Sequence, residues 1–338
     1  MPAKSTTLVC LIGEQPIPNL LPIFHFSPSH VVLVTTRLPR FVPIINALKQ
    51  VLQEKNIFTT LLTLSNEYSI SDCYTELEEQ LRQKDIVPTH INITGGTKPM
   101  SLAAFLLAEK NSFPVYYLES NREQKNQLYE SAFDNHILKQ VSVQSIHQQI
   151  SLVDFIRSFG YKTTERQPRD ALEIAVSTAI RACGLFEMRT GIQIDAQGNS
   201  DIDIMLRYED RYAMIEVKQV ARELCENCGK KVKPKPKQAL EQVVTISEQR
   251  IFGTYTNRIL ILHCAEDEVR NIDGITDMCK ILNTKWILLH DDYKQHGRLS
   301  TQDCERLYTS LFKVLGIQGN PAERGNETAS GANNIPPK

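Results

Sequence analysis

The chain has 338 residues, which is enough for about two domains of ordinary size. Its hydrophobic fraction of 41%, charged fraction of 23% and formal net charge of −1 are ordinary for a globular protein. They exclude nucleic-acid binding through bulk positive charge, so any such contact must come from a local patch. The eight cysteines are scattered, and no apolar run approaches the roughly 20 residues of a membrane span. We therefore expect a reduced, cytoplasmic protein without a membrane segment.

The first 150 residues alternate short apolar runs with segments of helical periodicity. The apolar runs predict strands at Thr7–Ile12, Val31–Thr36, Thr59–Leu64, His90–Thr94 and Val115–Glu119, and the periodic segments predict helices at Phe41–Lys55, Ser71–Lys84 and Pro99–Lys110. A closing hairpin is expected over Gln127–Phe133 and Ile137–Val143. Strands separated by such helices predict a parallel sheet, which binds ligands at the carboxyl ends of its strands.

Unusual residues gather at those carboxyl ends. The first strand is followed by Gly13-Glu14-Gln15-Pro16-Ile17-Pro18-Asn19, the second ends in Thr35-Thr36, and the fourth leads into Thr94-Gly95-Gly96-Thr97-Lys98-Pro99-Met100. The glycine pair allows close approach of the backbone to a ligand, and Pro99 suits a first helical turn. The helix N-terminus and the Lys98 charge then favour an anion. The plain alternative is an ordinary strand-to-helix turn. The string matches neither a Walker loop nor the dinucleotide fingerprint.

Two further strands, Ile202–Arg207 and Tyr212–Val217, are predicted to form a hairpin. Because side chains alternate along a strand, Glu216 and Lys218 share one face, and pairing can bring Asp203 opposite that face. Two converging carboxylates repel each other unless a divalent cation lies between them, and their oxygens suit Mg²⁺ or Mn²⁺. A lysine beside the cation can orient a water or stabilise a phosphoryl transition state. The plain alternative is a solvated strand edge, but both acids lie in apolar strands, where an unpaired charge is costly.

The other elements of the second half surround this hairpin. Helices are predicted at Asp170–Cys183, Gln238–Arg250, Val269–Leu282 and Thr301–Leu315, and strands at Met188–Ile194, Ile259–Cys264 and Trp286–Leu289. The first of these helices carries Glu173 near its start.

Asp203, Glu216 and Lys218 resemble the motif of the PD-(D/E)xK nuclease superfamily, whose members often carry a glutamate like Glu173 on the preceding helix. The element order αβββαβ is also that of restriction-endonuclease-like nucleases. The resemblance implies that Asp203 and Glu216, with the Val217 carbonyl, hold Mn²⁺ or Mg²⁺. It also implies that Lys218 positions the attacking water and that Glu173 holds a water on the metal or a second ion.

The loops Gly13–Asn19 and Thr94–Lys98 together resemble those of the CARF domain, the CRISPR-associated Rossmann-like sensor. The resemblance is closest to the branch in which CARF is fused to a PD-(D/E)xK nuclease. The family works as a homodimer, and this branch responds mainly to cyclic tetra-adenylate. The resemblance therefore implies a homodimer that this activator switches on to cleave DNA and RNA. The same resemblance assigns the activator site to Gly13, Gln15, Pro16, Thr35, Thr36, Thr94, Gly95, Gly96, Thr97, Lys98 and Met100.

The chain is therefore predicted to be an α/β protein with two domains. A Rossmann-like CARF domain with a parallel sheet is expected at residues 1–145, a linker at 146–168, a restriction-endonuclease-like PD-(D/E)xK domain at 169–317 and a disordered tail at 318–338. Two alternatives stay open: a non-catalytic sensor that only binds nucleic acid, and a ring nuclease that degrades its own activator.

Two segments after the hairpin also allow more than one interpretation. Cys225 and Cys228 form half of a zinc knuckle, but no second pair completes four ligands. Five lysines between Lys230 and Lys237 are either a solvated loop or, beside the metal site, a contact for the phosphate backbone.

Overall fold

The computed structural model describes residues 6–120, 126–146, 150–168, 170–194, 200–219, 252, 256–264, 275–291, 293 and 297–319. They form two compact units, divided between Lys162 and Thr163, within the predicted linker. No helix in the described ranges is long and apolar enough to cross a membrane. The predicted helix Gln238–Arg250, the Cys225–Cys228 pair, the lysines of residues 230–237 and the tail from residue 320 lie outside the described residues.

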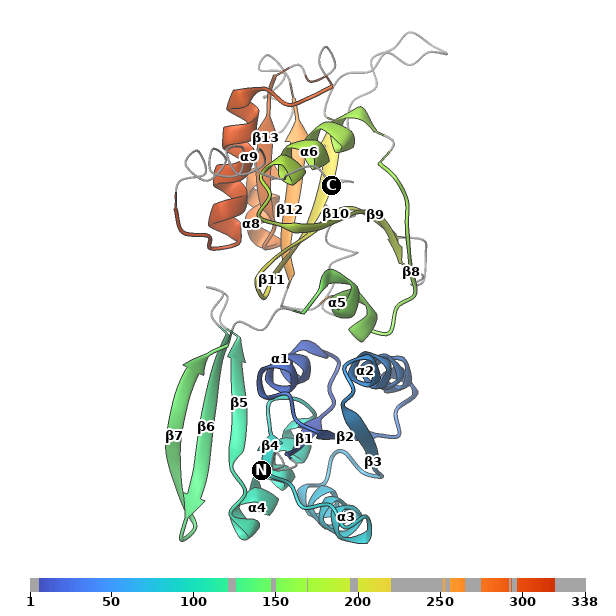
Figure 1. Ribbon diagram of the computed structural model, residues 1–338, viewed down its shortest axis with the longest axis vertical. Helices are drawn as coiled ribbons and strands as arrows, with labels where there is room; N and C mark the ends of the chain where they lie inside the picture. The colour runs from blue at the N-terminus through green and yellow to red at the C-terminus, as the bar shows by residue number, and fades with distance from the viewer. Residues whose placement is uncertain are drawn as a thin grey trace, which may run out of the picture. The chain divides into compact units, whose positions relative to one another are not determined.

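The first unit contains a seven-stranded sheet with helices on both faces (Figure 1). Its elements are β1 (Thr7–Leu11), α1 (Ile17–Phe26), β2 (His30–Thr36), a 3₁₀ turn (Pro39–Phe41), α2 (Val42–Glu54), β3 (Phe58–Leu64), α3 (Ile70–Gln83), β4 (His90–Asn92), α4 (Lys98–Asn111), β5 (Val115–Ser120), β6 (Asn126–Asp134), β7 (Ile137–Ser145) and α5 (Leu152–Ser158). The strand order is β3-β2-β1-β4-β5-β6-β7.

The sheet of the first unit is mixed rather than wholly parallel. Its first five strands are parallel to one another, as predicted, and the predicted hairpin adds β6 and β7 in antiparallel pairing. α1 and α2 lie on one face of the sheet, and α3 and α4 lie on the other (Figure 1). All five residues of β1 are buried, which is typical of a strand covered on both faces. α5 packs against α2, so this part of the predicted linker belongs to the first unit.

α1 is a helix that the sequence analysis does not predict, because its prolines count against one. Pro18 occupies the first turn, where its missing N–H has no partner in any helix. Pro22 lacks the N–H that would bond to the Pro18 carbonyl four residues earlier. Asn92 Nδ2 donates to that carbonyl instead, over 3.0 Å. The helix is thus completed by a side chain from β4.

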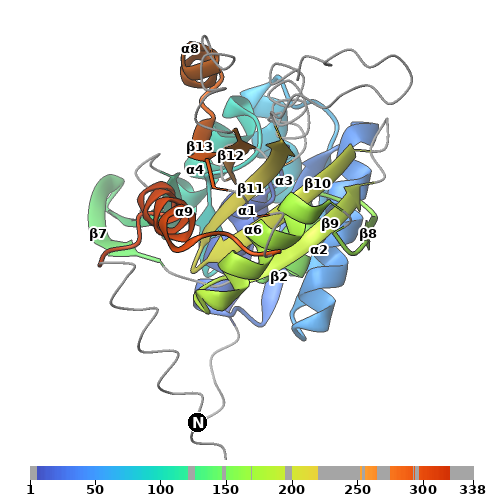
Figure 2. The same ribbon diagram turned by 90° about the horizontal axis from the view of Figure 1, so that it is seen from above.

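The second unit contains a six-stranded sheet with the order β13-β12-β11-β10-β9-β8. Its elements are β8 (Thr163–Glu165), α6 (Ala171–Ala182), β9 (Glu187–Ile194), β10 (Ser200–Tyr208), β11 (Arg211–Gln219), β12 (Thr256–His263), α8 (Ile275–Ile281), β13 (Lys285–Leu289) and α9 (Thr301–Val314). β11, β12 and β13 are parallel, whereas β8 to β11 pair antiparallel. Figure 2 shows β11, β10, β9 and β8 side by side in this order.

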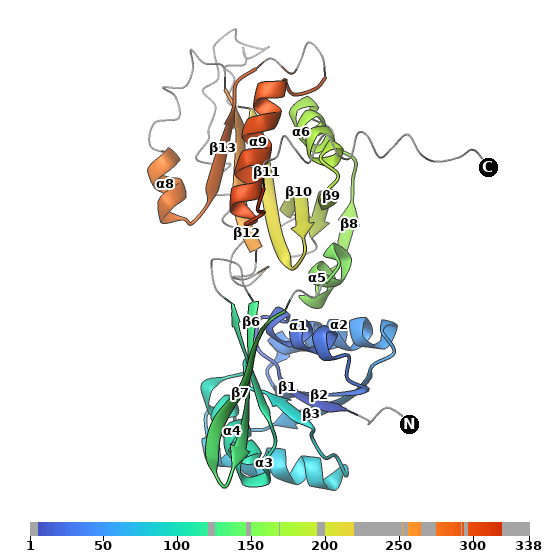
Figure 3. The same ribbon diagram turned by 60° about the vertical axis from the view of Figure 1, so that its left-hand side comes forward.

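The two faces of this second sheet are covered differently. α6 and α9 lie in front of it in Figure 3, where their apolar side chains share a buried cluster with β10 to β13. On the other face, α8 packs over β12 and β13 through a smaller cluster that includes Leu260 and Cys279. The candidate charged residues of β10 and β11 face the same side of the sheet as Leu260, because the register pairs Leu260 with Glu216.

Candidate functional site

Three charged side chains meet on one face of the second sheet. β10 and β11 are antiparallel, and their register pairs Ile204 with Ile215, which places Asp203 beside Glu216. Lys218 Nζ lies 2.7 Å from Glu216 Oε1 and 3.6 Å from Asp203 Oδ2. The structure therefore brings together the three residues that the sequence analysis selected, from two neighbouring strands.

Both carboxylates of this group are almost completely buried. Asp203 and Glu216 are each 3% exposed. Asp203 Oδ2 accepts a hydrogen bond of 2.8 Å from the Val217 N–H. Glu216 Oε1 has its ion pair with Lys218 but no donor at hydrogen-bond geometry among the described residues. Burial, and then the negative charge of Asp203, raises the pKa of Glu216 to about 8.

The pKa values of Lys218 and Glu173 are shifted by the same burial and the same neighbouring charges. Burial lowers the pKa of Lys218, but the Glu216 and Asp203 carboxylates outweigh it and raise that pKa above its ordinary value. Glu173 lies in the first turn of α6, where Asp170 caps the helix by accepting from the Glu173 N–H. Burial, followed by the Asp203 and Asp170 charges, raises the pKa of Glu173. Glu173 therefore lies within electrostatic reach of the group.

These residues fit a hard divalent cation that keeps part of its water shell. Within the described ranges, no three His, Cys, Asp or Glu side chains form a complete set of metal ligands. Magnesium, however, is commonly bound through one or two carboxylates and several waters. Asp203 and Glu216 supply two such carboxylates, and among the described residues Lys218 is the one cation paired with Glu216 Oε1. Positive charge at this place would also offset the mutual repulsion of the buried acids.

In the first unit, the loops after β1 and β4 touch through their backbones. A Cβ atom on Gly95 would lie 2.0 Å from the Leu11 carbonyl oxygen, and one on Gly13 would lie 3.3 Å from the Gly96 nitrogen. Gly96 also has a φ of +74°, a conformation that glycine adopts without strain. The glycines of the predicted activator site are therefore required by this close approach.

The second of these loops ends at the N-terminus of α4. Thr97 caps the helix by accepting from the Met100 N–H over 3.4 Å, and its hydroxyl donates to the Glu67 carbonyl over 2.9 Å. Lys98, the first residue of α4, is exposed. An exposed ammonium group at a helix N-terminus favours an anionic ligand.

Other residues of the predicted activator site lie at the same edge of the sheet but are mostly buried. Pro16 is the buried N-cap of α1, and Gln15 precedes it in a half-exposed position. Thr35 and Thr36 are 2% and 4% exposed at the end of β2, and Met100 is 1% exposed in the core. Thr35, Thr36 and Met100 are thus buried beneath the loops and do not form part of the exposed surface.

Sequence reasoning missed two buried amides beneath these loops. Asn19 and Asn92 are both 0% exposed, and Asn92 Nδ2 donates to Asn19 Oδ1 over 3.1 Å. The signal in the sequence was an asparagine between two isoleucines in an otherwise apolar strand. Thr94, which the sequence analysis assigned to the ligand, uses its hydroxyl to bond Asn92 Oδ1 over 2.6 Å.

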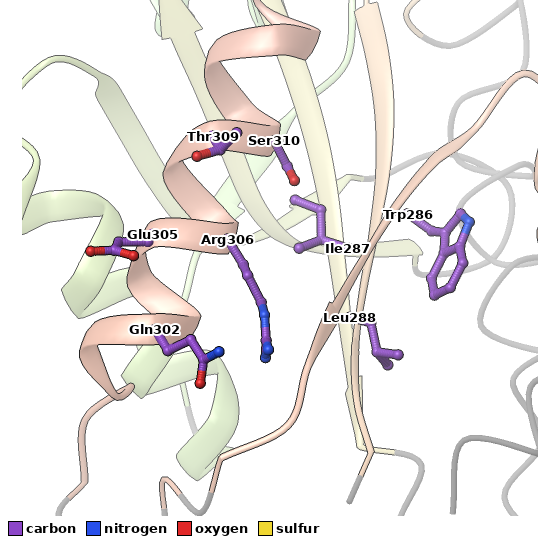
Figure 4. Close-up of a pocket in the computed structure, with 8 residues that line it drawn as sticks. All are labelled: Trp286, Ile287, Leu288, Gln302, Glu305, Arg306, Thr309 and Ser310. Atoms are coloured by element: carbon purple, nitrogen blue, oxygen red, sulfur yellow. The ribbon is translucent and has the colours of Figure 1, made fainter. Parts of the chain in front are cut away.

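A groove of about 540 Å³ also lies between β13 and α9 (Figure 4). Arg306 points from α9 toward this space, whereas Trp286 points away from the helix (Figure 4). The guanidinium is paired over 3.0 Å with the fully buried Asp303. None of the candidate charged residues of β10 and β11 lines this groove, which follows the edge strand two places away from β11.

Comparison with known proteins identifies the first unit. Residues 7–155 match the family model described as the Card1 CARF domain. A search of curated proteins gives no match.

Solved structures extend the likeness of fold beyond the first unit. Protein VC1899 from Vibrio cholerae is 11% identical with a TM-score of 0.63, over 94% of this chain and 99% of that one. Can2 from Sulfobacillus thermosulfidooxidans, solved in complex with cyclic tetra-adenylate, is 14% identical with a TM-score of 0.63, over 93% and 98%. A type III CRISPR defence DNA nuclease activated by cyclic oligoadenylate is 13% identical with a TM-score of 0.56, over 95% of this chain but 53% of that one. At these identities the likeness shows the fold alone, and the family model identifies residues 7–155 as a CARF domain.

Proposed function

We propose that this protein is a metal-dependent nuclease of type III CRISPR defence that cyclic tetra-adenylate activates. The observation that carries the proposal is the presence in one chain of a CARF domain and a buried Asp203–Glu216–Lys218 group. The fold shared with Can2, which was solved with cyclic tetra-adenylate, and with a cyclic oligoadenylate-activated DNA nuclease supports it.

In the first unit, the loops after β1 and β4 would bind the activator. Cyclic tetra-adenylate carries a phosphate in every repeat, and the start of α4 offers the exposed Lys98 ammonium to such a group. Gly13, Gly95 and Gly96 let the two loops pack closely against each other and against the end of β1, so the two loops form one continuous surface for the ligand.

In the second unit, the charged group would perform phosphodiester hydrolysis. Asp203 and Glu216 would hold Mn²⁺ or Mg²⁺, and the Val217 carbonyl is the further ligand that the sequence resemblance implies. Such a cation supplies Lewis acidity and positive charge at a scissile phosphate. Lys218 is 38% exposed, so its ammonium can donate to an incoming water or to a phosphate oxygen while it stays paired with Glu216. Glu173 would hold a water or a second ion from α6.

The active form would be a homodimer. Two leucines of α4, Leu102 and Leu106, are 51% and 46% exposed, and Val141 and Val143 of the edge strand β7 are 59% and 44% exposed. Exposed apolar side chains of this size are available for burial in an interface. A two-fold dimer would also present the same loops twice to a ligand with repeating chemistry.

The substrates would be DNA and RNA, cut in the cytoplasm without strong sequence preference.

One assay tests the proposal as a whole. Purified protein is incubated with plasmid and with single-stranded DNA and RNA, with and without cyclic tetra-adenylate and Mn²⁺. We expect cleavage only when both are present, and no cleavage by Glu216→Ala. Binding of cyclic tetra-adenylate without any cleavage would instead indicate a non-catalytic sensor. Loss of the ring itself, measured by chromatography in the Glu216→Ala protein, would indicate a ring nuclease.

A further inference from the structure

Two asparagine side chains are buried at the centre of the first unit, beneath the ligand loops. Asn92, the last residue of β4, and Asn19, in the first turns of α1, are both 0% exposed. Asn92 Nδ2 donates to the Pro18 carbonyl over 3.0 Å and to Asn19 Oδ1 over 3.1 Å. Asn92 Oδ1 accepts from the Thr94 N–H over 3.1 Å and from its hydroxyl over 2.6 Å. One amide therefore bonds α1 on one side and the loop after β4 on the other.

The same hydrogen-bond network reaches the ends of two more strands. Asn19 Nδ2 donates to the Leu11 carbonyl, at the end of β1, over 2.9 Å. Thr94 Oγ1 accepts from the Leu118 N–H of β5 over 2.8 Å. The Leu11 carbonyl is also the atom against which Gly95 packs, because a Cβ there would lie 2.0 Å away. The Leu11 carbonyl is therefore bonded to Asn19 of α1 and packed against Gly95 of the second loop, so the network connects the segments that carry both loops.

α1 depends on this network for its own position. Pro22 cannot donate to the Pro18 carbonyl, so the helix has a free acceptor in its buried first turns. A buried acceptor without a donor is unfavourable, and Asn92 supplies the donor from β4. Losing the Asn92 amide would therefore release the helix that begins at the first loop, as well as the second loop.

We propose that Asn92 and Asn19 are positioning residues for the activator site: they hold residues 13–16 and 94–98 at one separation, so that affinity depends on them although neither side chain is accessible. This proposal rests on the proposed function, because the affinity concerned is that for cyclic tetra-adenylate. Lys98 contributes its charge at the correct place only while the loop that precedes it is held.

The plainer interpretation is that these amides only stabilise the fold, and the opposite end of the same strands supplies a control. The Thr89 hydroxyl accepts from the Thr7 N–H over 3.0 Å and donates to the Thr7 carbonyl over 2.8 Å. This pair also ties the β4 segment to β1, but at the edge of the sheet away from the loops. Thr89→Val should therefore lower stability without moving residues 13–16 or 94–98.

The experiment measures the Kd for cyclic tetra-adenylate by calorimetry and the urea midpoint of unfolding, in the full-length wild type, Asn92→Asp, Asn19→Ala and Thr89→Val. Asn92→Asp leaves at most one hydrogen for two acceptors, and Asn19→Ala removes the bond to Leu11 without adding charge. We expect each to weaken binding by about tenfold or more, as for the loss of a buried hydrogen bond that binding requires. Thr89→Val should change Kd by less than about twofold, within the usual scatter of independent sites.

A double-mutant cycle with Lys98→Ala separates positioning from stability. If Asn19 holds the loop, Lys98→Ala should cost clearly less affinity in the Asn19→Ala background than in wild type, and the full wild-type cost in the Thr89→Val background. Additive effects of Asn19 and Lys98, or a wild-type Kd in Asn19→Ala, would overturn the proposal. Should Asn92→Asp fail to fold, Asn19→Ala decides alone. A wild type that binds no cyclic tetra-adenylate would refute the proposed function rather than this inference.

Discussion

The two candidate sites of this chain differ in the charge of their buried polar groups. Beneath the loops of the first unit, the buried polar groups are neutral, and the hydrogen bonds of Asn19 and Asn92 are made inside the protein. In the second unit, Asp203 and Glu216 are buried as acids, Lys218 is ion-paired with both, and burial raises the pKa of both. The buried groups of the first site are neutral, whereas the second holds two acids whose close ion pairs, among the described residues, are with the single ammonium of Lys218.

This difference teaches what each site can contribute. A neutral, hydrogen-bonded scaffold fixes the positions of the loops, and the exposed Lys98 adds a full positive charge at the end of one of them. Such a site should set affinity. A buried group with an uncompensated carboxylate favours a cation and stabilises charge that develops in a reaction, so it should set rate. Substitutions in the two units should therefore change different measurable quantities.

The largest expected effect is loss of cleavage from the charged group. Asp203→Ala or Glu216→Ala removes one of the two buried carboxylates that Lys218 pairs with, and we expect cleavage to fall below detection. Lys218→Ala should lower the rate by about 10²- to 10³-fold, as for removal of one electrostatic group from an active site. The Kd for cyclic tetra-adenylate should stay at its wild-type value in all three proteins. Single-turnover cleavage and calorimetry measure the two quantities separately.

A glutamate elsewhere on the same sheet provides the control for this prediction. Glu187 of β9 is ion-paired with Arg207 and does not belong to the charged group. Glu187→Ala should cleave at close to the wild-type rate. Near-normal cleavage by Glu216→Ala would show that the reaction takes place elsewhere.

The next effect in size separates affinity from rate in the first unit. Lys98→Ala removes a charge-assisted contact to a ring phosphate, which contributes on the order of 1.5–3 kcal/mol, or about 10- to 150-fold in affinity. The activator concentration for half-maximal cleavage should rise by that factor, with a similar plateau. Lys110→Ala is the matched control, because Lys110 lies at the other end of α4 and pairs with Glu78 over 2.7 Å.

Titration of cyclic tetra-adenylate against cleavage rate distinguishes the outcomes for Lys98→Ala. A lower plateau would mean that Lys98 also transmits activation. An unshifted curve would show that residues 94–100 are not the sensor, and the distinction between an affinity site and a rate site would fail.

The parts that the sequence could predict are those governed by short-range periodicity. Alternation along a strand was sufficient to place Glu216 and Lys218 on one face of the sheet. It also placed Asp203 on that same face, on the neighbouring strand, because the register of a tight hairpin follows from the alternation of apolar and polar residues. Continuous apolar runs likewise located the buried strands of the first unit.

What could not be predicted depends on contacts between distant residues. α1 contains Pro18 and Pro22, and local rules therefore count against a helix there. The compensating donor, Asn92, lies 74 residues after Pro18 in the chain. The raised pKa of Glu216 is equally non-local, because it comes from burial by the surrounding fold.

Metal affinity should depend on pH through Glu216. Since its pKa is raised to about 8 without a cation, a proton competes with Mn²⁺ for the carboxylate below that pH. Displacement of one proton predicts that affinity rises by up to about tenfold per pH unit between pH 6 and 8 and levels off above. Calorimetry with Mn²⁺ across this range measures the slope, and Glu216→Gln should bind weakly with a shallower profile. A flat profile in wild type would contradict proton competition at this site.

The last prediction concerns the stability of the metal-free protein. The pKa of Glu216 is about 8 in the folded chain and has its ordinary value of 4.5 in the unfolded chain. The folded state therefore holds a proton that the unfolded state releases, and this contribution is full below pH 4.5 and is lost as pH rises toward 8. One proton corresponds to a decrease of up to about 1.4 kcal/mol per pH unit in the free energy of unfolding. Because Asp203 and Glu173 also have raised pKa values, the informative quantity is the difference between wild type and Glu216→Gln, measured by urea unfolding in EDTA at pH 5, 6, 7 and 8. That difference should move in favour of Glu216→Gln as pH rises. A difference that stays constant with pH would mean that Glu216 ionises in the folded protein as it does in water, and the uncompensated charge that distinguishes the second site from the first would be absent.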